Sequence, residues 1–520
     1  MAVWRAGVAL IALVAIAVAL WQLLAAEQGI VRETARVGDT PVSVYRAADT
    51  ESGPAVLIAH GFAGSQQMMA SYALTLARNG YVAVTYDFRG HGRNPRPLTG
   101  ALDKQSGAAR VLADQTAEVA AYARQRADTD GRLALLGHSM AGNILVQYAH
   151  RHDGVAAMVG VSVFAPTITA DTPPNLQLIA GQFEATLRDR ARDIVAQVAD
   201  TAPEAVRPGV THGDVAEGTA RRFVVAPWVE HVGVLWSATA VDAARAWLDT
   251  VFARDGAGWT AERGPWIGLL LVAIIALGWP LASGLPVADA PLPHGRGAGW
   301  RELAMVSGIP AIATPLILWP LPTAFLPVLV ADYVALHFGV YGALTAALLW
   351  WRAGRPGVRA IGAEAGLARP RVALRVGLGA VVMSAFILVV FGGALDRFVT
   401  SFQPVAGRWP VIGAILVGTL MFTLADEWLT RGPHAVRGAY PATKLMFLLS
   451  LGLAIALDPG SLFFLIIILP VMVASFIVYG LFSRWVYRRT GHPAIAGVAN
   501  GVAFAWALGV TFPMFAGGGL

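Results

Sequence analysis

The chain has 520 residues, of which 56% are hydrophobic and only 14% are charged, and its formal net charge at pH 7 is +6. This composition is more apolar than that of an ordinary soluble protein. The absence of cysteine excludes disulfides, thiolate metal sites and a cysteine nucleophile. The positive charge does not indicate a nucleic-acid partner, because many arginines lie in short loops between apolar segments, and we expect no cofactor and no metal.

The hydrophobic residues divide the chain into three parts. Residues 4–26 form an apolar segment long enough to cross a bilayer of about 30 Å, and we predict that residues 1–26 are an uncleaved membrane anchor. Residues 27–263 have mixed charge and alternating strand and helix patterns, as in one soluble domain. Residues 264–520 form a predicted membrane domain with eight spans. The nine predicted spans are 4–26, 265–286, 303–320, 324–351, 373–395, 410–428, 445–457, 461–483 and 494–516.

The basic residues between these spans alternate between the two sides of the membrane. One side has Arg397 and Arg408, and the other has Arg5 and most of the remaining basic loop residues. These are Arg296, Arg301, Arg352, Arg355, Arg359, Arg369, Arg371, Arg431, Arg437, Lys444, Arg484, Arg488 and Arg489. Because cytoplasmic loops carry the excess of Lys and Arg, we predict a multi-pass protein of a bacterial-type inner membrane. Its N-terminus is then cytoplasmic, and the soluble domain is on the opposite side.

Two predicted spans have unusual lengths. Residues 324–351 are long enough for a kinked helix or two short segments, and residues 445–457 are short for a span. A change in either would alter the topology of everything that follows.

The soluble domain alternates strand and helix patterns, which predicts an α/β fold with a parallel sheet covered on both faces. The predicted strands are residues 55–59, 81–86, 133–136, 156–164, 176–180 and 222–226, and the main helices are residues 66–78, 107–126, 143–150 and 187–206. Ligands of such sheets bind beyond the carboxyl ends of the strands. His60, Asp87 and Ser139 follow the first three strands, so we expect them at one edge of the sheet.

The motif Gly-His-Ser-Met-Ala-Gly at residues 137–142 lies between a predicted strand and a predicted helix. A serine on such a sharp turn is strained and exposed, and only small neighbours fit beside it. Gly137 and Ala141 meet that requirement. The motif predicts a nucleophilic serine, Ser139, provided that a base, an acid and an oxyanion hole accompany it.

Residues 40–254 resemble the α/β-hydrolase family. The resemblance rests on His60-Gly61-Phe62, on Asp-Phe-Arg-Gly-His-Gly at residues 87–92, as in lipase-like and serine-aminopeptidase-like members, and on the serine motif. Ala141 departs from the usual glycine. The resemblance implies an α/β-hydrolase fold with the chain order serine, acid, histidine.

The family order implies a role for each of three side chains. Ser139 would be the nucleophile. His231, which follows the last strand, would be the general base and then the general acid. Glu184, three positions after Gly181, would orient the imidazole. Asp171 and Asp189 lie near Glu184 in the chain and are alternative acids. Backbone amides of Phe62 and Met140 would form the oxyanion hole. The residues expected to support this site are His60, Gly61, Asp87 and His138.

The membrane part carries a second polar motif, Asp426-Glu427-Trp-Leu-Thr-Arg431. It resembles the Glu-Glu-x-x-x-Arg motif of the CAAX-protease-like intramembrane family. However, Gly497 stands where that family has a functional histidine. Glu427 and Arg431 are four residues apart on one helix face, and we therefore expect a structural ion pair.

These observations predict a membrane-anchored serine hydrolase that cleaves carboxylic esters or thioesters through an acyl-enzyme. Only residues 165–174 connect two of the predicted strands, which leaves no room for the lid that many lipases insert there. A site tethered at a membrane favours a small-molecule or lipid acyl substrate, with membrane lipid as its neighbour. The alternatives are a serine peptidase of the same fold and a transporter or lipid-handling protein with an accessory hydrolase domain.

Overall fold

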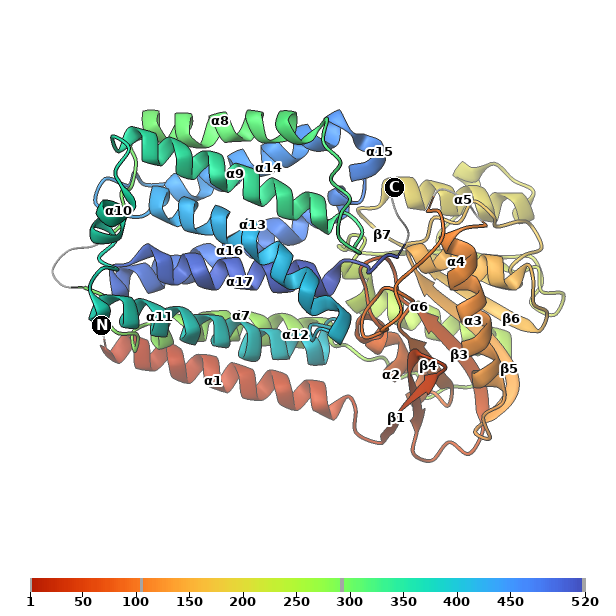
Figure 1. Ribbon diagram of the computed structural model, residues 1–520. Helices are drawn as coiled ribbons and strands as arrows, with labels where there is room; N and C mark the ends of the chain where they lie inside the picture. The colour runs from red at the N-terminus through yellow and green to blue at the C-terminus, as the bar shows by residue number, and fades with distance from the viewer. Residues whose placement is uncertain (1, 103–105, 290–293, 517–520) are drawn as a thin grey trace.

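The computed structural model describes residues 2–102, 106–289 and 294–516. It has two parts: a bundle made of α1 and the helices from α7 to α17, and an α/β domain formed by residues 30–252 (Figure 1). The α/β domain lies at one end of the bundle, which we call the junction end. The chain begins at the other, remote end, and α1 runs along the bundle toward the α/β domain.

The α/β domain is built on a nine-stranded sheet in the order β1-β2-β4-β3-β5-β6-β7-β9-β8. The strands β4, β3, β5, β6, β7 and β9 run parallel to their neighbours in this series. The strands β1 and β2 extend the sheet antiparallel on one side, and β8 does so on the other. The bounds are β1 (Ile30–Val37), β2 (Thr40–Ala47), β3 (Gly53–Ala59), β4 (Val82–Tyr86), β5 (Thr129–His138), β6 (Val155–Val161), β7 (Leu176–Gly181), β8 (Thr211–His212) and β9 (Arg221–Ala226). The predicted α/β class with a parallel sheet is confirmed.

Helices cover both faces of the sheet, because the central strands are apolar on both sides. In β3, Leu57 packs into a core shared with α3, α4 and α5, whereas Val56 and Ile58 pack into a second core shared with α2 and α6. The helix bounds are α2 (Ala70–Arg78), α3 (Ala108–Arg124), α4 (Met140–Ala149), α5 (Ala185–Ala199) and α6 (Ala238–Phe252). Short 3₁₀ segments are η1 (Gln66–Met69), η2 (Pro203–Ala205) and η3 (Gly233–Trp236).

The boundaries of several elements differ from the prediction. The antiparallel strands β1, β2 and β8 were not predicted, and the first predicted helix divides into η1 and α2. β6 ends at Val161 instead of residue 164, because Ser162 has φ of +50°, a left-handed conformation that interrupts a strand. α5 ends at Ala199 because Asp200 adopts a left-handed cap with φ of +45°.

In the described part of the chain, nine helices are long and apolar enough to cross a membrane, which is the predicted number. Their bounds are α1 (Ala2–Ala25), α7 (Gly264–Ala282), α8 (Trp300–Leu318), α9 (Ala331–Arg352), α11 with α12 (Pro370–Ala385 and Gly392–Phe398, joined by a π-helical turn), α13 (Trp409–Thr430), α14 (Ala439–Leu457), α16 (Leu465–Thr490) and α17 (Pro493–Thr511). Two short helices, α10 (Val358–Glu364) and α15 (Pro459–Leu462), complete the bundle.

Most of the predicted spans have different limits in the structure, and the span predicted as 461–483 extends to Thr490. The segment 324–351 contains one helix that begins only at Ala331, and the segment predicted as 445–457 begins at Ala439 and so has 19 residues. The last helix ends at Thr511 instead of continuing to 516. The residues that follow it turn back to the α/β domain, where Phe515 forms an isolated bridge with Leu98, while Met514 forms one with Val328 just before α9.

Small residues let α13 and α17 approach closely in the centre of the bundle. Thr423 Oγ1 donates a hydrogen bond to the Gly497 carbonyl at 2.7 Å, and Thr419 Oγ1 donates to the Gly501 carbonyl at 2.8 Å. A Cβ atom at Gly497 would lie 3.0 Å from Leu424 Cδ2 and 3.3 Å from Leu424 Cα. Close packing of this kind is typical of helices in a membrane. It leaves no room for a histidine at position 497.

Candidate active site

Strand β5 delivers Ser139 to the sharp turn that starts α4. The backbone of Ser139 has φ of +53° and ψ of −118°, a strained conformation for a residue with a side chain. A Cβ atom at Gly137 would lie 2.7 Å from Leu145 Cδ1 and 3.2 Å from Ala141 Cβ. The turn therefore needs glycine at position 137, whereas the methyl group of Ala141 is accommodated and fully buried.

Ser139, His231 and Glu184 are hydrogen-bonded in a line, although they come from three distant parts of the chain. The distance from Ser139 Oγ to His231 Nε2 is 2.8 Å, and the distance from His231 Nδ1 to Glu184 Oε1 is 2.6 Å. With Nδ1–H donating to the carboxylate, Nε2 is free to accept the proton of the serine hydroxyl. Of the alternative acids, Asp189 forms an exposed ion pair with Arg192 at 3.2 Å.

The second oxygen of Glu184 is held by two donors. Glu184 Oε2 accepts hydrogen bonds from Ser162 Oγ at 2.5 Å and from the Gly181 amide at 2.6 Å. Burial opposes ionisation of Glu184, but the hydrogen bonds from His231, Ser162 and Gly181 outweigh it and hold its pKa below the ordinary value. Glu184 is therefore an anion at neutral pH. Ser162 was not predicted, because the sequence analysis placed it inside the strand expected at residues 156–164, whereas in the structure that strand ends at Val161.

His138 supports the loop that carries His231. Its Nε2–H donates to the His231 carbonyl at 2.9 Å, and burial lowers the pKa of His138 to about 3. His138 is therefore neutral and acts as a fixed donor. Its ring lies beside that of His231, with the two ring centroids 5.1 Å apart and the planes at 46°.

Gly61 brings the loop after β3 directly against the serine turn. A Cβ atom at Gly61 would lie 2.8 Å from His138 Nδ1 and 3.0 Å from Ser139 Cβ, so only glycine permits this approach. His60 fixes the same loop, since its Nδ1–H donates to the Gly61 carbonyl at 2.8 Å and its Nε2 accepts from the Phe88 amide at 3.1 Å. The amide of Phe62 follows this contact in the chain.

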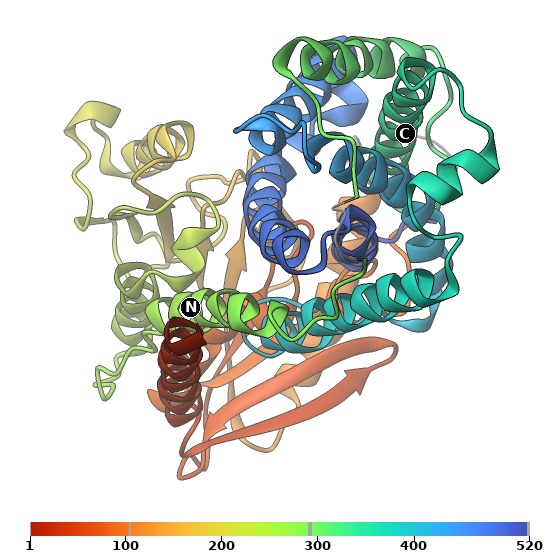
Figure 2. The same cartoon turned by 90° about the vertical axis from the view of Figure 1, so that its left-hand side faces the viewer.

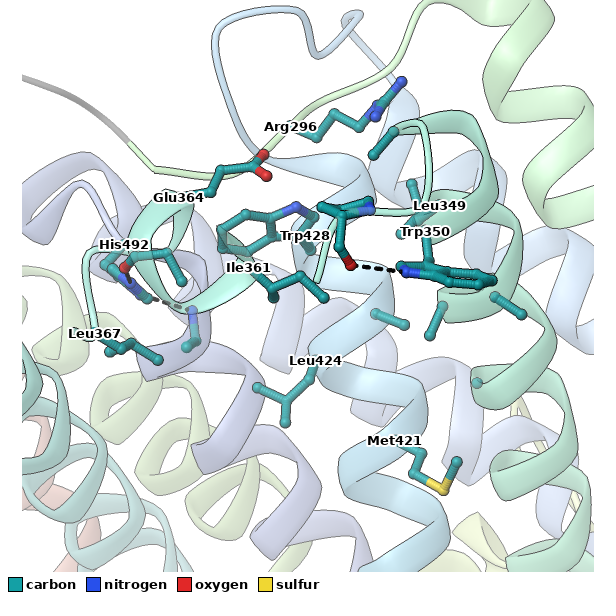
Figure 3. A pocket seen from close by; sticks show the side chains of 18 residues that line it. Arg296, Leu349, Trp350, Ile361, Glu364, Leu367, Met421, Leu424, Trp428 and His492 are labelled. Atoms are coloured by element: carbon teal, nitrogen blue, oxygen red, sulfur yellow. Dashed lines mark hydrogen bonds between the residues drawn. The ribbon is translucent and has the colours of Figure 1, made fainter. Parts of the chain in front are cut away.

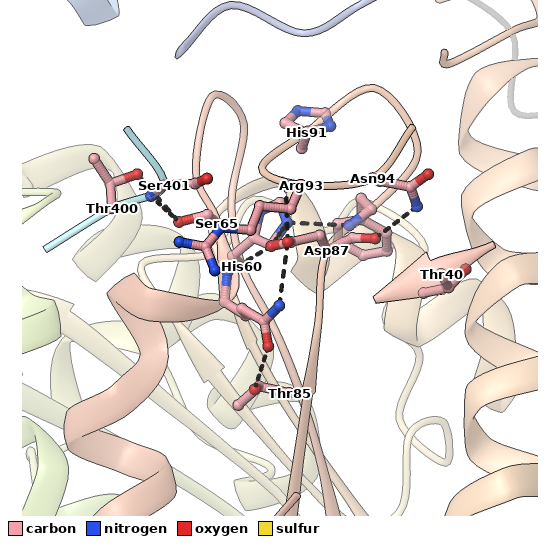
Figure 4. Close-up of polar contacts among 12 residues, drawn as sticks. Thr40, His60, Ser65, Thr85, Asp87, His91, Arg93, Asn94, Thr400 and Ser401 are labelled. Atoms are coloured by element: carbon pink, nitrogen blue, oxygen red, sulfur yellow. Dashed lines mark hydrogen bonds and ion pairs between the residues drawn. The ribbon is translucent and has the colours of Figure 1, made fainter. Parts of the chain in front are cut away.

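Asp87 is fully buried and ties two loops together (Figure 4). Its Oδ1 accepts from the Gln66 amide at 2.8 Å, and its Oδ2 accepts from the Arg93 amide at 3.0 Å. Asn94 Nδ2 donates to the Asp87 carbonyl at 2.9 Å. These contacts hold the loop after β4 against the loop after β3. Both oxygens of the Asp87 carboxylate accept hydrogen bonds within these loops.

The bundle contacts the same two loops at its junction end. Ser65 Oγ lies 3.1 Å from Thr400 Oγ1 and accepts from the Ser401 amide at 2.8 Å (Figure 4). The ring of Phe62 stacks on the ring of Phe464, with centroids 4.5 Å apart and planes at 23°. Residues of the bundle thus support the loop that carries the predicted oxyanion-hole amide.

A buried arginine joins the loop after β4 to the end of the chain. Arg408 is fully buried, and its guanidinium donates at 2.8 Å to the carbonyls of Gly90, Gly509 and Phe512. The Met514 amide donates to the same Gly90 carbonyl at 2.8 Å. The sequence analysis counted Arg408 among the basic residues of a loop between two spans; in the structure its side chain is buried at the junction.

The polar motif of α13 forms two ion pairs. Glu427 Oε2 and Arg431 Nε are 3.1 Å apart, as the four-residue spacing indicates. Asp426 pairs with Lys444, which lies in α14 and is 7% exposed. The prediction that Lys444 belongs to a basic loop is therefore wrong, because α14 begins six residues earlier than its apolar pattern suggests.

A cavity of about 620 Å³ lies at the remote end of the bundle, between α9, α10 and α13 (Figure 3). Trp350, Trp428 and Met421 contribute to its mostly apolar wall, and Arg296 and Glu364 lie at its rim. The cavity is separated from Ser139 by the length of the bundle. Within the described ranges, no group of three or more His, Asp or Glu side chains is arranged to hold a metal ion.

Comparisons with known proteins match the α/β part of the chain. Residues 50–206 match the family described as serine aminopeptidase, S33. A fluoroacetate dehalogenase from Burkholderia sp is 31% identical over 140 residues, which are 27% of this chain and 43% of that protein. The chain thus spans less than half the length of this curated relative.

Two solved structures also match the chain. A protein from Klebsiella pneumoniae assigned as a dienelactone hydrolase has a TM-score of 0.32 and 15% identity, and the match covers 44% of this chain and 99% of that chain. A protein from Thermoplasma acidophilum described as a CIB-like hydrolase has a TM-score of 0.31 and 13% identity, and the match covers 43% of this chain and 97% of that chain. The observed sheet and the family match assign the α/β-hydrolase fold to this part of the chain and support a hydrolase.

Proposed function

We propose that the chain is a membrane-anchored serine hydrolase that cleaves carboxylic esters or thioesters. In this proposal residues 1–26 are an anchor, residues 27–263 the hydrolase domain and residues 264–520 a membrane domain. The observation that carries the proposal is the hydrogen-bonded line from Ser139 through His231 to Glu184, at the carboxyl ends of β5, β7 and β9.

The proposed reaction has two acyl-transfer steps. His231 Nε2 takes the proton of Ser139 while Oγ attacks the acyl carbon, and the imidazolium then protonates the leaving alcohol or thiol. Water, deprotonated by His231, hydrolyses the acyl-enzyme and releases the acid. The anion of Glu184 stabilises the imidazolium, and the amides of Phe62 and Met140 are the proposed donors to the oxyanion.

A serine peptidase of the same fold is the second candidate, favoured by the family description of residues 50–206. The chemistry at Ser139 would be the same, with an amine as leaving group. Cleavage of short peptide amides by the purified protein, with acyl esters left intact, would favour this candidate.

A fluorophosphonate probe tests the proposal in purified full-length protein. We expect the folded protein to be labelled and the label to map to the peptide that contains Ser139, because only an activated serine reacts readily. Heat-denatured protein is the control and is expected to lose labelling. Absence of labelling in folded protein, under conditions that label a known serine hydrolase, would contradict the proposal.

We further propose that the hydrolase domain lies on the extracytoplasmic side of an inner membrane. The remote end of the bundle contains Arg5 and the exposed arginines Arg352, Arg355 and Arg359, and cytoplasmic ends carry such an excess of basic residues. In sealed inside-out vesicles, the hydrolase domain is therefore expected to resist added protease until detergent is present. Cleavage of this domain before detergent is added would reverse the assignment.

A further inference from the structure

The edge of the sheet that carries the candidate site faces the junction end of the bundle. The parallel strands from β3 to β9 have their carboxyl ends along one edge. The loops after β3 and β4, at one side of this edge, contact the bundle through Phe62, Ser65 and Gly90. Since the strands are parallel, the loops after β6, β7 and β9 also lie on the side of the domain that faces the bundle.

These remaining loops are not covered by the bundle. Figure 2, which views the molecule from the remote end of the bundle, shows the yellow helix α5 beside the bundle rather than behind it. α5 starts two residues after Phe183, so the loop after β7 is outside the area that the bundle covers. If the bundle spans a bilayer, this part of the domain lies over lipid.

The loops over this uncovered part present large aromatic side chains to the solvent. Phe164, Phe183 and Trp228 follow β6, β7 and β9, and they are 60%, 61% and 79% exposed. The rings of Phe183 and Trp228 lie 6.5 Å apart. Such neighbouring exposed aromatics are unusual on a protein surrounded only by water, and they mark a contact surface. We call these three residues the aromatic edge.

Exposed tryptophans on the bundle indicate where the lipid surface lies. Tryptophan is enriched at both boundaries of a membrane protein. At the junction end these residues are Trp21, Trp319 and Trp409, which are 64%, 61% and 53% exposed; at the remote end they are Trp4, Trp300 and Trp351, which are 76%, 56% and 51% exposed. Each lies within a few residues of a helix end. The exposed tryptophans at the junction end therefore lie at the end of the bundle toward which the aromatic edge faces.

We propose that the aromatic edge rests on the bilayer surface and that Ser139 takes its acyl substrate from the adjacent leaflet. This substrate assignment rests on the proposed function. Phe183 directly precedes Glu184, and Trp228 lies three residues before His231, so the loops that contact lipid are the loops that carry the site. The substrate class is an amphiphile with its ester at the depth of the headgroups and its acyl chain in the bilayer.

Single cysteines test the lipid contact, because the chain has none of its own. Phe164→Cys, Phe183→Cys and Trp228→Cys are labelled with a fluorophore and placed in nanodiscs that contain nitroxide-bearing lipids. Val210→Cys is the matched control: Val210 is 44% exposed and precedes β8, which pairs with the amino-terminal end of β9 at the opposite edge. We expect nitroxide quenching at the three test positions and not at the control.

The substrate assignment is tested with two esters, one embedded in the nanodisc bilayer and one short and water-soluble. For Phe183→Ser and Trp228→Ser we expect KM for the embedded ester to rise about tenfold, because aromatic contact with the interface is lost. Hydrolysis of the soluble ester should change less than about twofold, because both side chains are largely exposed and neither belongs to the hydrogen-bonded line at Ser139.

The possible failures are distinguishable. If the three labelled positions are quenched by aqueous iodide as strongly as the control and not by nitroxide lipid, the lipid contact is overturned, although the soluble ester is still hydrolysed. If nitroxide quenching is found but wild-type protein hydrolyses neither ester, the proposed function is overturned and the substrate assignment with it. Equal effects of Trp228→Ser on both esters overturn the bilayer as the source of substrate.

Discussion

Replacing Ser139 with alanine is expected to lower kcat/KM for an ester by ~10⁴- to 10⁶-fold without unfolding the protein. The substitution removes only the hydroxyl that lies 2.8 Å from His231 Nε2. The Cβ atom stays, so packing against Gly61 and the backbone strain at φ of +53° are unchanged. The measurement compares ester hydrolysis with thermal unfolding of the same preparation.

A second serine separates loss of chemistry from loss of stability. Ser237 caps α6 by accepting a hydrogen bond from the Ala240 amide at 3.4 Å. Ser237→Ala should lower the free energy of unfolding by about 1 kcal/mol and leave ester hydrolysis close to that of the wild type. If Ser139→Ala retained activity within tenfold of this control, an acyl-enzyme on Ser139 would be ruled out.

The site residues that the sequence analysis predicted are those whose positions depend on nearby residues in the chain. A strand that ends in a tight turn before a helix leaves a recognisable pattern at residues 137–142, and the family order then points to Glu184 and His231. The positions of Gly61 and His138 follow the same pattern, since Gly61 lies two residues after the end of β3 and His138 is the last residue of β5. Short-range rules suffice here because each side chain is placed by the end of its own strand.

The parts that were not predicted depend on contacts between distant segments. Ser162 reaches Glu184 only because β6 ends early, and Arg408 is buried only because the chain returns to the α/β domain after α17. Lys444 is paired within the bundle because Asp426 on another helix faces it. The hydrophobic periodicity of one segment does not indicate such a partner, because the stabilising contact forms only when distant segments come together in the folded protein.

The junction brings residues of the bundle into contact with two loops at the candidate site. Phe464 and Ser401 contact the loop after β3, whose Gly61 packs against Ser139, and Arg408 contacts the loop after β4. Asp87 then joins those two loops to each other. A shift of the bundle relative to the α/β domain would therefore move the loop that carries Phe62, and the geometry of a site of this kind is sensitive to displacements of about 1 Å.

Replacing Glu184 with glutamine is expected to lower kcat by ~10³- to 10⁴-fold with little change in KM. The amide of glutamine can present N–H to His231 Nδ1, which favours the tautomer with the proton on Nε2. His231 could then no longer accept the proton of Ser139, although the distance between them would be preserved. Ser162 Oγ and the Gly181 amide would still hold the side chain, so the fold should not change.

The alternative acids supply matched controls for this substitution. Asp189→Asn removes one charge from an exposed pair with Arg192 at 3.2 Å, and Asp171→Asn removes one from a solvent-exposed loop. Both variants should keep kcat within about twofold of the wild type, because exposed charges contribute little to a site they do not contact. A larger loss of kcat in Asp171→Asn or Asp189→Asn than in Glu184→Gln would assign the orienting role to that aspartate instead.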